Sequence, residues 1–150
     1  MKQPQTIAEL QQSGCQTVSV KDELRRNLIG RMKSGEDLLP GIIGYHDSVI
    51  PEIENAILSG HNIIFLGERG QAKTRIMRKF VDLLDEYIPV IAGCEINDNP
   101  FVPVCRQCQN AIREHQGDTR ITWIVRSMRY AEKLATPDVS IADLIGDIDP

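Results

Sequence analysis

The residues with the clearest chemical potential lie in the stretch Asn62-Ile-Ile-Phe-Leu-Gly67-Glu-Arg-Gly70-Gln-Ala72-Lys73-Thr74. An apolar segment with the pattern of a buried strand leads into a glycine-bearing loop, and Lys-Thr opens an expected helix. The amides of such a loop bind phosphate oxygens, the lysine reaches the β- and γ-phosphates, and the hydroxyl ligates Mg²⁺. The pattern therefore predicts a phosphate-binding loop (P-loop) for ATP and Mg²⁺, with the positive end of the helix dipole aimed at the anion.

One position departs from the motif G-x-x-x-x-G-K-[ST], because Ala72 stands where the second glycine is expected. Glycine serves there because the backbone must approach the phosphates closely, so a methyl group can reduce affinity. Gly70 can supply the conformational freedom instead. The alternative interpretation is a tight strand-to-helix turn in which Lys-Thr is incidental.

A second set of residues has the chemistry of a metal site. Cys105-Arg-Gln-Cys108 is a C-x-x-C pair, with Cys94 upstream and His115 downstream. Four nitrogen or sulfur ligands suffice for a tetrahedral structural zinc. A strong zinc signature has two such pairs, and here the second half is scattered. The alternatives are reduced thiols in an insertion or a redox switch, although no thioredoxin-like pattern surrounds the pair.

The bulk composition limits the classes of function. The 150 residues are 41% hydrophobic and 25% charged, as in a soluble globular domain. A net charge of −4 and a pI near 5.4 argue against a protein that coats nucleic acid or an anionic membrane. The sequence shows no apolar run of membrane-spanning length and no signal-peptide pattern. We therefore expect a cytoplasmic protein with no nucleic-acid or membrane partner.

Helices and strands are expected around both sets of residues. Residues 1 to 19 are expected to be a flexible lead-in with one short helix over 7–12. Ser19 and Asp22 form a capping-box pattern at the start of a helix that Gly35 ends. A second helix is expected from Asp47 to Gly60, a third over 73–86, and shorter ones over 107–115 and 141–145.

Strands are expected over 62–66, 90–93 and 122–125, and residues 94–120 form a cysteine-containing insertion. A strand, a loop, a helix and a second strand in this order build parallel sheets. The sequence thus predicts an α/β fold of the P-loop NTPase type, with parallel β-strands flanked by helices, and the family resemblance described below implies that this fold is incomplete at its C-terminus.

No catalytic residue is assigned. Leu83-Leu84-Asp85-Glu86 has the letters of a Walker B end, but Asp85 lies 12 residues after Lys73 in one helical pattern. That separation is about 18 Å along a helix axis, too far from the phosphates. Asp143, Asp147 and Asp149 follow no long apolar strand. The chain is therefore predicted to bind nucleotide rather than to hydrolyse it.

Three segments carry a family resemblance: Leu39-Pro-Gly-Ile-Ile-Gly44-Tyr45, the loop itself, and residues 129–138 with 142–150. Together they resemble the AAA+ ATPase module of the magnesium chelatase ATPase subunit and its MoxR-like relatives, over residues 38–150. The resemblance implies that Ile43 and Gly44 line the adenine and that Thr74 meets Mg²⁺. The residues expected to contact the nucleotide are Ile43, Gly44, Gly67, Glu68, Arg69, Gly70, Gln71, Ala72, Lys73, Thr74 and Arg75.

The resemblance also sets expectations for the whole protein. Relatives continue into Walker B, sensor residues, an arginine finger and a helical lid, so residues 20–150 are expected to be the N-terminal portion of the module, cut short. Full-length relatives couple ATP hydrolysis in a homo-oligomeric ring to remodelling or metal insertion, with a von Willebrand A-type domain protein as a partner.

Two other functions compete with this one. The first is a regulatory or interaction module that binds nucleotide without hydrolysing it. In one version of this alternative, a structural zinc ion stabilises the module. The second is a nucleoside-phosphate kinase, which the absence of an arginine-rich lid disfavours.

Overall fold

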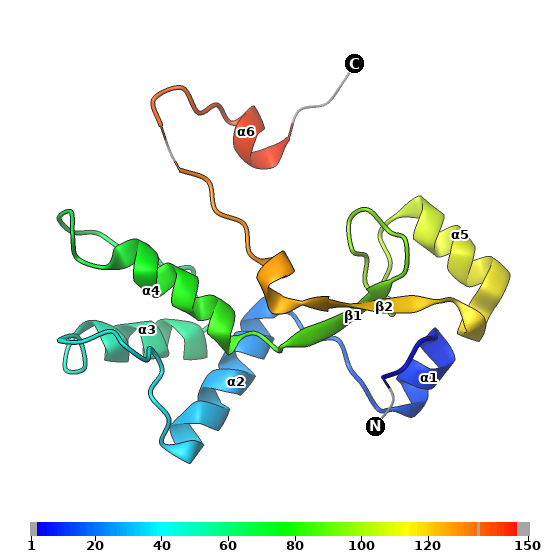
Figure 1. Ribbon diagram of the computed structural model, residues 1–150, viewed down its shortest axis with the longest axis horizontal. Coiled ribbons are helices and arrows are strands. Elements are labelled where there is room, and N and C mark those ends of the chain that lie inside the picture. The colour runs from blue at the N-terminus through cyan, green and yellow to red at the C-terminus, as the bar shows by residue number, and fades with distance from the viewer. Residues whose placement is uncertain (1–2, 135, 147–150) are drawn as a thin grey trace.

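The computed structural model describes residues 3–134 and 136–146. The two strands are β1 (Tyr87–Ile91) and β2 (Ile121–Val125). The α-helices in this part of the chain are α1 (Ile7–Gln12), α2 (Val20–Ser34), α3 (Val49–Leu58), α4 (Lys73–Lys79), α5 (Arg106–His115) and α6 (Ala142–Ile145). Short 3₁₀ turns follow three of these elements: η1 (Phe80–Leu83), η2 (Gln116–Asp118) and η3 (Arg126–Arg129). Figure 1 shows α2, α3 and α4 grouped on one side of the two-stranded sheet and α5 on the other.

Helix α2 begins and ends where the sequence predicts. The Ser19 hydroxyl accepts a hydrogen bond from the Asp22 backbone N–H at 3.2 Å, which satisfies a free amide of the first turn. Gly35 ends the helix with φ 72°, a left-handed conformation that glycine adopts without steric cost. The predicted helix is confirmed at both ends, because caps are local signals.

The larger hydrophobic core joins α2, α3 and α4. Helix α3 turns one face inward, and the spacing of Ile50, Ile53 and Ile57 is that of a single helical stripe. Burying each of these side chains stabilises the fold by about 1.5–3 kcal/mol. The buried residues of this core are Leu28, Leu38, Leu39, Ile42, Ile50, Ile53, Ile57, Ile76 and Leu83.

The predicted α/β fold of the P-loop NTPase type, with its parallel sheet, is wrong. Strands β1 and β2 pair antiparallel, with Tyr87 opposite Val125 and Ile91 opposite Ile121. Ile91 and Ile121 bound the long connection that contains α5, so residues 92–120 leave and re-enter the sheet at the same end. That connection is a hairpin with a large insert rather than a crossover, and only a crossover gives parallel strands. In the part of the chain that the structure describes, these two strands are the whole sheet.

The predicted strand over 62–66 does not form. Within the described residues, none of the backbone groups in this segment makes a backbone hydrogen bond. Its side chains still alternate: Ile63 and Phe65 pack against the larger core, whereas Ile64 and Leu66 are 83% and 89% exposed. The sequence pattern thus sets the two faces of the segment, but a strand also needs a neighbour to pair with.

Residues 4–10 pack on the sheet, although the sequence suggests a flexible lead-in. Ile7 and Leu10 of α1 are buried with Ile121 of β2 in a second, smaller core. The Trp123 indole N–H donates to the Pro4 carbonyl at 2.9 Å. Helix α1 is therefore a structural partner of β2, through contacts far apart in the sequence.

A buried ion pair joins α2 to η3, the short turn that follows β2. Glu23 of α2 is 2% exposed and accepts bonds from both terminal nitrogens of Arg129, at 2.7 and 2.5 Å. The same carboxylate accepts a hydrogen bond from the Asp85 backbone N–H at 2.7 Å.

Among the described helices, none is long and apolar enough to cross a membrane.

Candidate phosphate-binding loop and cysteine cluster

The loop before α4 has the backbone shape of a tight, glycine-dependent turn. Gly67 and Gly70 have φ values of 152° and 86°, and Ala72 lies in the left-handed region with φ 57° and ψ 13°. A Cβ atom on Gly67 would clash with the Gln71 side-chain amide, because the loop folds back over this glycine. Helix α4 then begins at Lys73, as the sequence predicts.

The Lys73 ammonium is enclosed by its own loop. Its Nζ atom donates to the Gly67 carbonyl at 2.8 Å and to the Glu68 carbonyl at 2.5 Å. The Tyr45 hydroxyl donates to the Gln71 carbonyl at 3.3 Å, which ties the loop to the chain before α3. Neither partner of the ammonium carries a full negative charge, and no carboxylate in the described chain pairs with it.

The backbone N–H groups of this loop lack protein acceptors. From Gly67 to Arg75, no backbone N–H donates to another group of the described chain. Thr74 lies in the first turn of α4 and is exposed. Free amides next to an uncompensated ammonium form an environment that suits a polyanion.

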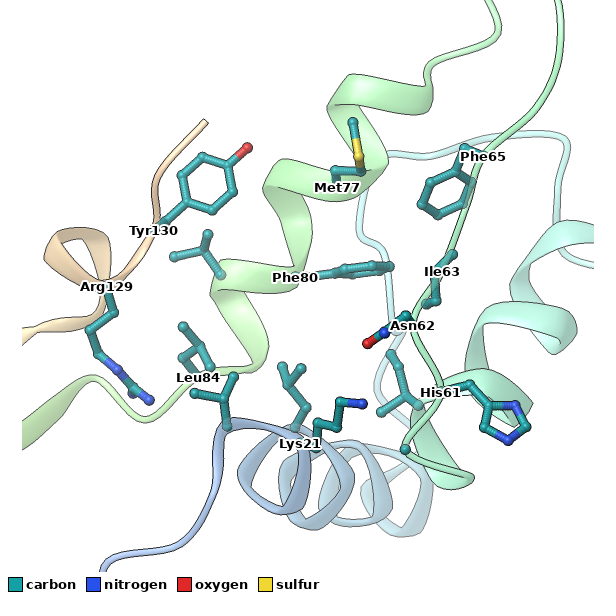
Figure 2. A pocket seen from close by; sticks show the side chains of 15 residues that line it. Lys21, His61, Asn62, Ile63, Phe65, Met77, Phe80, Leu84, Arg129 and Tyr130 are labelled. Carbon is teal, nitrogen blue, oxygen red and sulfur yellow. The ribbon is translucent and has the colours of Figure 1, made fainter. Parts of the chain in front are cut away.

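The residues expected to line the adenine are placed less favourably. Ile43 is 87% exposed, and Gly44 forms a turn with φ 87°. A cavity of about 500 Å³ lies on another part of the molecule, lined by apolar side chains of α4, η1 and the 62–66 segment, with Lys21, His61 and Arg129 (Figure 2). None of the residues expected to contact the nucleotide lines this cavity. Asp147 and Asp149 lie outside the described residues.

The cysteine cluster is the second site. The ligand atoms of Cys94, Asp98, Cys105 and Cys108 all lie within 4.8 Å of one another, so this cluster could hold a metal such as zinc. His115, which the sequence offers as the fourth ligand, is exposed at the end of α5. It lies about 10 Å beyond Cys108 along the helix axis. The structure thus brings the three predicted cysteines together and places Asp98 beside them in place of the histidine.

Local structure explains how the cluster assembles. The chain turns sharply after β1, with φ 77° at Gly93 and φ 53° at Asn97, and the Ile91 N–H donates to the Asp98 carbonyl at 3.0 Å. Cys105 is the N-cap of α5, so Cys108 lies in the first turn of that helix.

The Asp98 carboxylate connects the two cysteine-bearing segments. It accepts backbone N–H bonds from Asn99 at 2.9 Å, from Val104 at 2.9 Å and from Cys105 at 2.7 Å.

The surroundings shift the pKa values of the groups in the cluster in opposite directions. Burial raises the pKa of the Cys94 thiol, but hydrogen bonds from the Asp98 N–H, the Cys108 thiol and the Ile96 N–H outweigh it and lower the pKa overall. Burial and hydrogen bonds with Cys94 and Cys105 raise the pKa of Cys108 to about 12. Burial opposes ionisation of Asp98 too, yet the N–H donors of Cys105, Val104 and Asn99 hold its pKa below the usual range.

Asp98 is the candidate ligand that sequence reasoning misses. It stands in Asn97-Asp98-Asn99-Pro100, where every letter is typical of a turn. The sequence does hold one sign of this ligand, because Asp98 is an acidic residue that lies four residues after Cys94 and before the C-x-x-C pair.

Comparison of the chain with protein-family models, curated proteins and solved structures gives no match in any of the three. The functional argument therefore depends on the chemistry of the two sites.

Proposed function

We propose that this chain binds Mg²⁺-ATP through the loop from Gly67 to Arg75. The observation that supports the proposal is the state of Lys73, whose ammonium has only neutral carbonyl partners inside a loop of free amides. Nucleotide phosphates would replace these two neutral carbonyls with negatively charged oxygens, so the ammonium would gain ion pairs in place of bonds to uncharged acceptors.

The remaining roles follow from the sequence motif. Thr74 would ligate the Mg²⁺ ion, and Ile43 and Gly44 would contact the adenine. The proposal includes the AAA+ resemblance of the chelatase type, a ring of subunits in the full-length protein and a cytoplasmic location. In that location the four cysteines would stay reduced or bind metal.

Calorimetric titration of Mg²⁺-ATP tests the proposal. Lys73→Ala should weaken binding tenfold or more, since a lost charge-assisted bond costs about 1.5–3 kcal/mol. Lys79→Ala is the matched control, because Lys79 ends the same helix and pairs with Asp82. Equal affinities for the wild type and Lys73→Ala would refute the site.

The cysteine cluster favours a second candidate, a zinc-stabilised interaction module that uses the loop as a scaffold for binding a partner rather than as a nucleotide site. The two candidates differ in what the loop contributes. Metal binding together with Mg²⁺-ATP titrations that Lys73→Ala leaves unchanged would select the module. Nucleotide binding that requires Lys73 would select the first proposal.

A further inference from the structure

We propose that Cys94, Asp98, Cys105 and Cys108 bind one zinc ion through three sulfurs and one carboxylate oxygen. The ion would fix the turn after β1 to the first turn of α5. This inference goes beyond nucleotide binding and does not depend on it.

The positions of the ligand atoms fit a tetrahedral ion with little rearrangement. With Zn–S bonds of about 2.3 Å, the corners of a tetrahedral site lie about 3.8 Å apart. The four ligand atoms already lie within 4.8 Å of one another, so contraction by about 1 Å would close the site. Thiolate ligands also select zinc over magnesium or calcium, which prefer sites made only of oxygen.

The charge of Asp98 gives an independent reason for a cation. Its side chain is 5% exposed, and its oxygens accept bonds only from neutral backbone N–H groups. No lysine, arginine or histidine of the described chain pairs with it. Its backbone donors already stabilise this carboxylate as an anion. A zinc ion at the centre of the cluster would add a full positive charge, which none of the described side chains supplies.

The backbone around the cluster is arranged to hold anionic ligands. The N–H groups of Val104 and Cys105 donate to the Asp98 carboxylate at 2.9 and 2.7 Å. Cys105 and Cys108 lie at the positive end of the α5 dipole, in a helix of ten residues. Such donors around ligand atoms are the outer shell that orients metal ligands in proteins.

The test is the zinc content of the full chain, purified without chelator under reducing conditions. About one equivalent is expected in the wild type, and Cys94→Ser and Asp98→Ala should each lower it at least fivefold. Two matched controls should keep the full equivalent: Cys15→Ser removes the one cysteine outside the cluster, and His115→Ala removes the ligand that the sequence suggests. Lys73→Ala should also keep its zinc, so this result is separate from nucleotide binding.

A second measurement covers a variant that fails to fold. In the wild type, a thiol reagent should modify Cys15 readily and Cys94 and Cys105 at least tenfold more slowly, although all three are half-buried. A zinc chelator should abolish this difference. Under about a tenth of an equivalent of zinc, with Cys94 and Cys105 as reactive as Cys15, would overturn the proposal. Zinc lost in His115→Ala but kept in Asp98→Ala would overturn its ligand set.

Discussion

Ala72 is in a backbone conformation that suits glycine better than alanine. Its φ of 57° lies in the left-handed region, where a Cβ atom approaches the following carbonyl and costs about 1–2 kcal/mol. The conformation places Lys73 at the start of α4 with its ammonium inside the loop. The chain thus keeps the loop shape at a cost in stability.

Ala72→Gly should therefore raise the free energy of unfolding by about 1 kcal/mol and keep or improve the affinity for Mg²⁺-ATP. Urea unfolding and calorimetry measure the two quantities. Ala56→Gly, in the regular helix α3, is the control and should lower stability by about 1 kcal/mol. A loss of affinity in Ala72→Gly would show that the methyl group supports the loop.

At the scale of helices and strands, the pair of Glu23 and Arg129 is the main polar link between α2 and the chain after β2. Glu23 is buried and the Arg129 side chain is 10% exposed, so removing the arginine leaves a buried carboxylate without its cation. Arg129→Ala should lower the free energy of unfolding by about 3–5 kcal/mol. Arg25→Ala, an exposed change on α2, should stay within about 0.5 kcal/mol of the wild type. A loss for Arg129→Ala no larger than that of Arg25→Ala would contradict this account.

A second link between elements depends on pH. Asp85 accepts hydrogen bonds from Asn27 at 2.9 Å and from Arg26 at 2.5 Å. Burial raises the pKa of Asp85, but these bonds outweigh it and hold the pKa below the usual range. Because the folded pKa is depressed, the stabilisation is present above about pH 4 and is lost as the pH falls through the folded value.

The matching experiment compares the wild type with Asp85→Asn in urea. Since the side chains of Asp85 and Arg26 are 41% and 51% exposed, the difference at pH 7 should be below about 1 kcal/mol. It should shrink as the pH falls towards 3. A difference that stays constant from pH 7 to pH 3 would show that the charge of Asp85 is not responsible.

These elements also show what the sequence can and cannot predict. The ends of α2 follow from Ser19 and Gly35, and the start of α4 follows from the loop motif, because both are local signals. The direction of β2 is not local, since it depends on how residues 92–120 return to the sheet. Asp98 was missed for the same reason, because only the folded turn brings its carboxylate to the cysteines.

At the scale of the whole molecule, the two candidate sites are far apart. Figure 1 shows the loop before α4 at one end of the long axis and α5 at the other. Sites this distant with no shared partners usually behave additively. Zinc binding and nucleotide binding should therefore be separable by substitutions in either site, which makes each proposal testable without the other.

The most direct test of nucleotide binding is amide hydrogen exchange with and without Mg²⁺-ATP. The N–H groups from Gly67 to Arg75 have no protein acceptors, so they should exchange rapidly in the free chain. Mg²⁺-ATP should slow their exchange at least tenfold in the wild type, and Lys73→Ala should need at least tenfold more Mg²⁺-ATP for the same protection. Exchange in residues 67–75 that stays equally fast at saturating Mg²⁺-ATP would contradict the central claim.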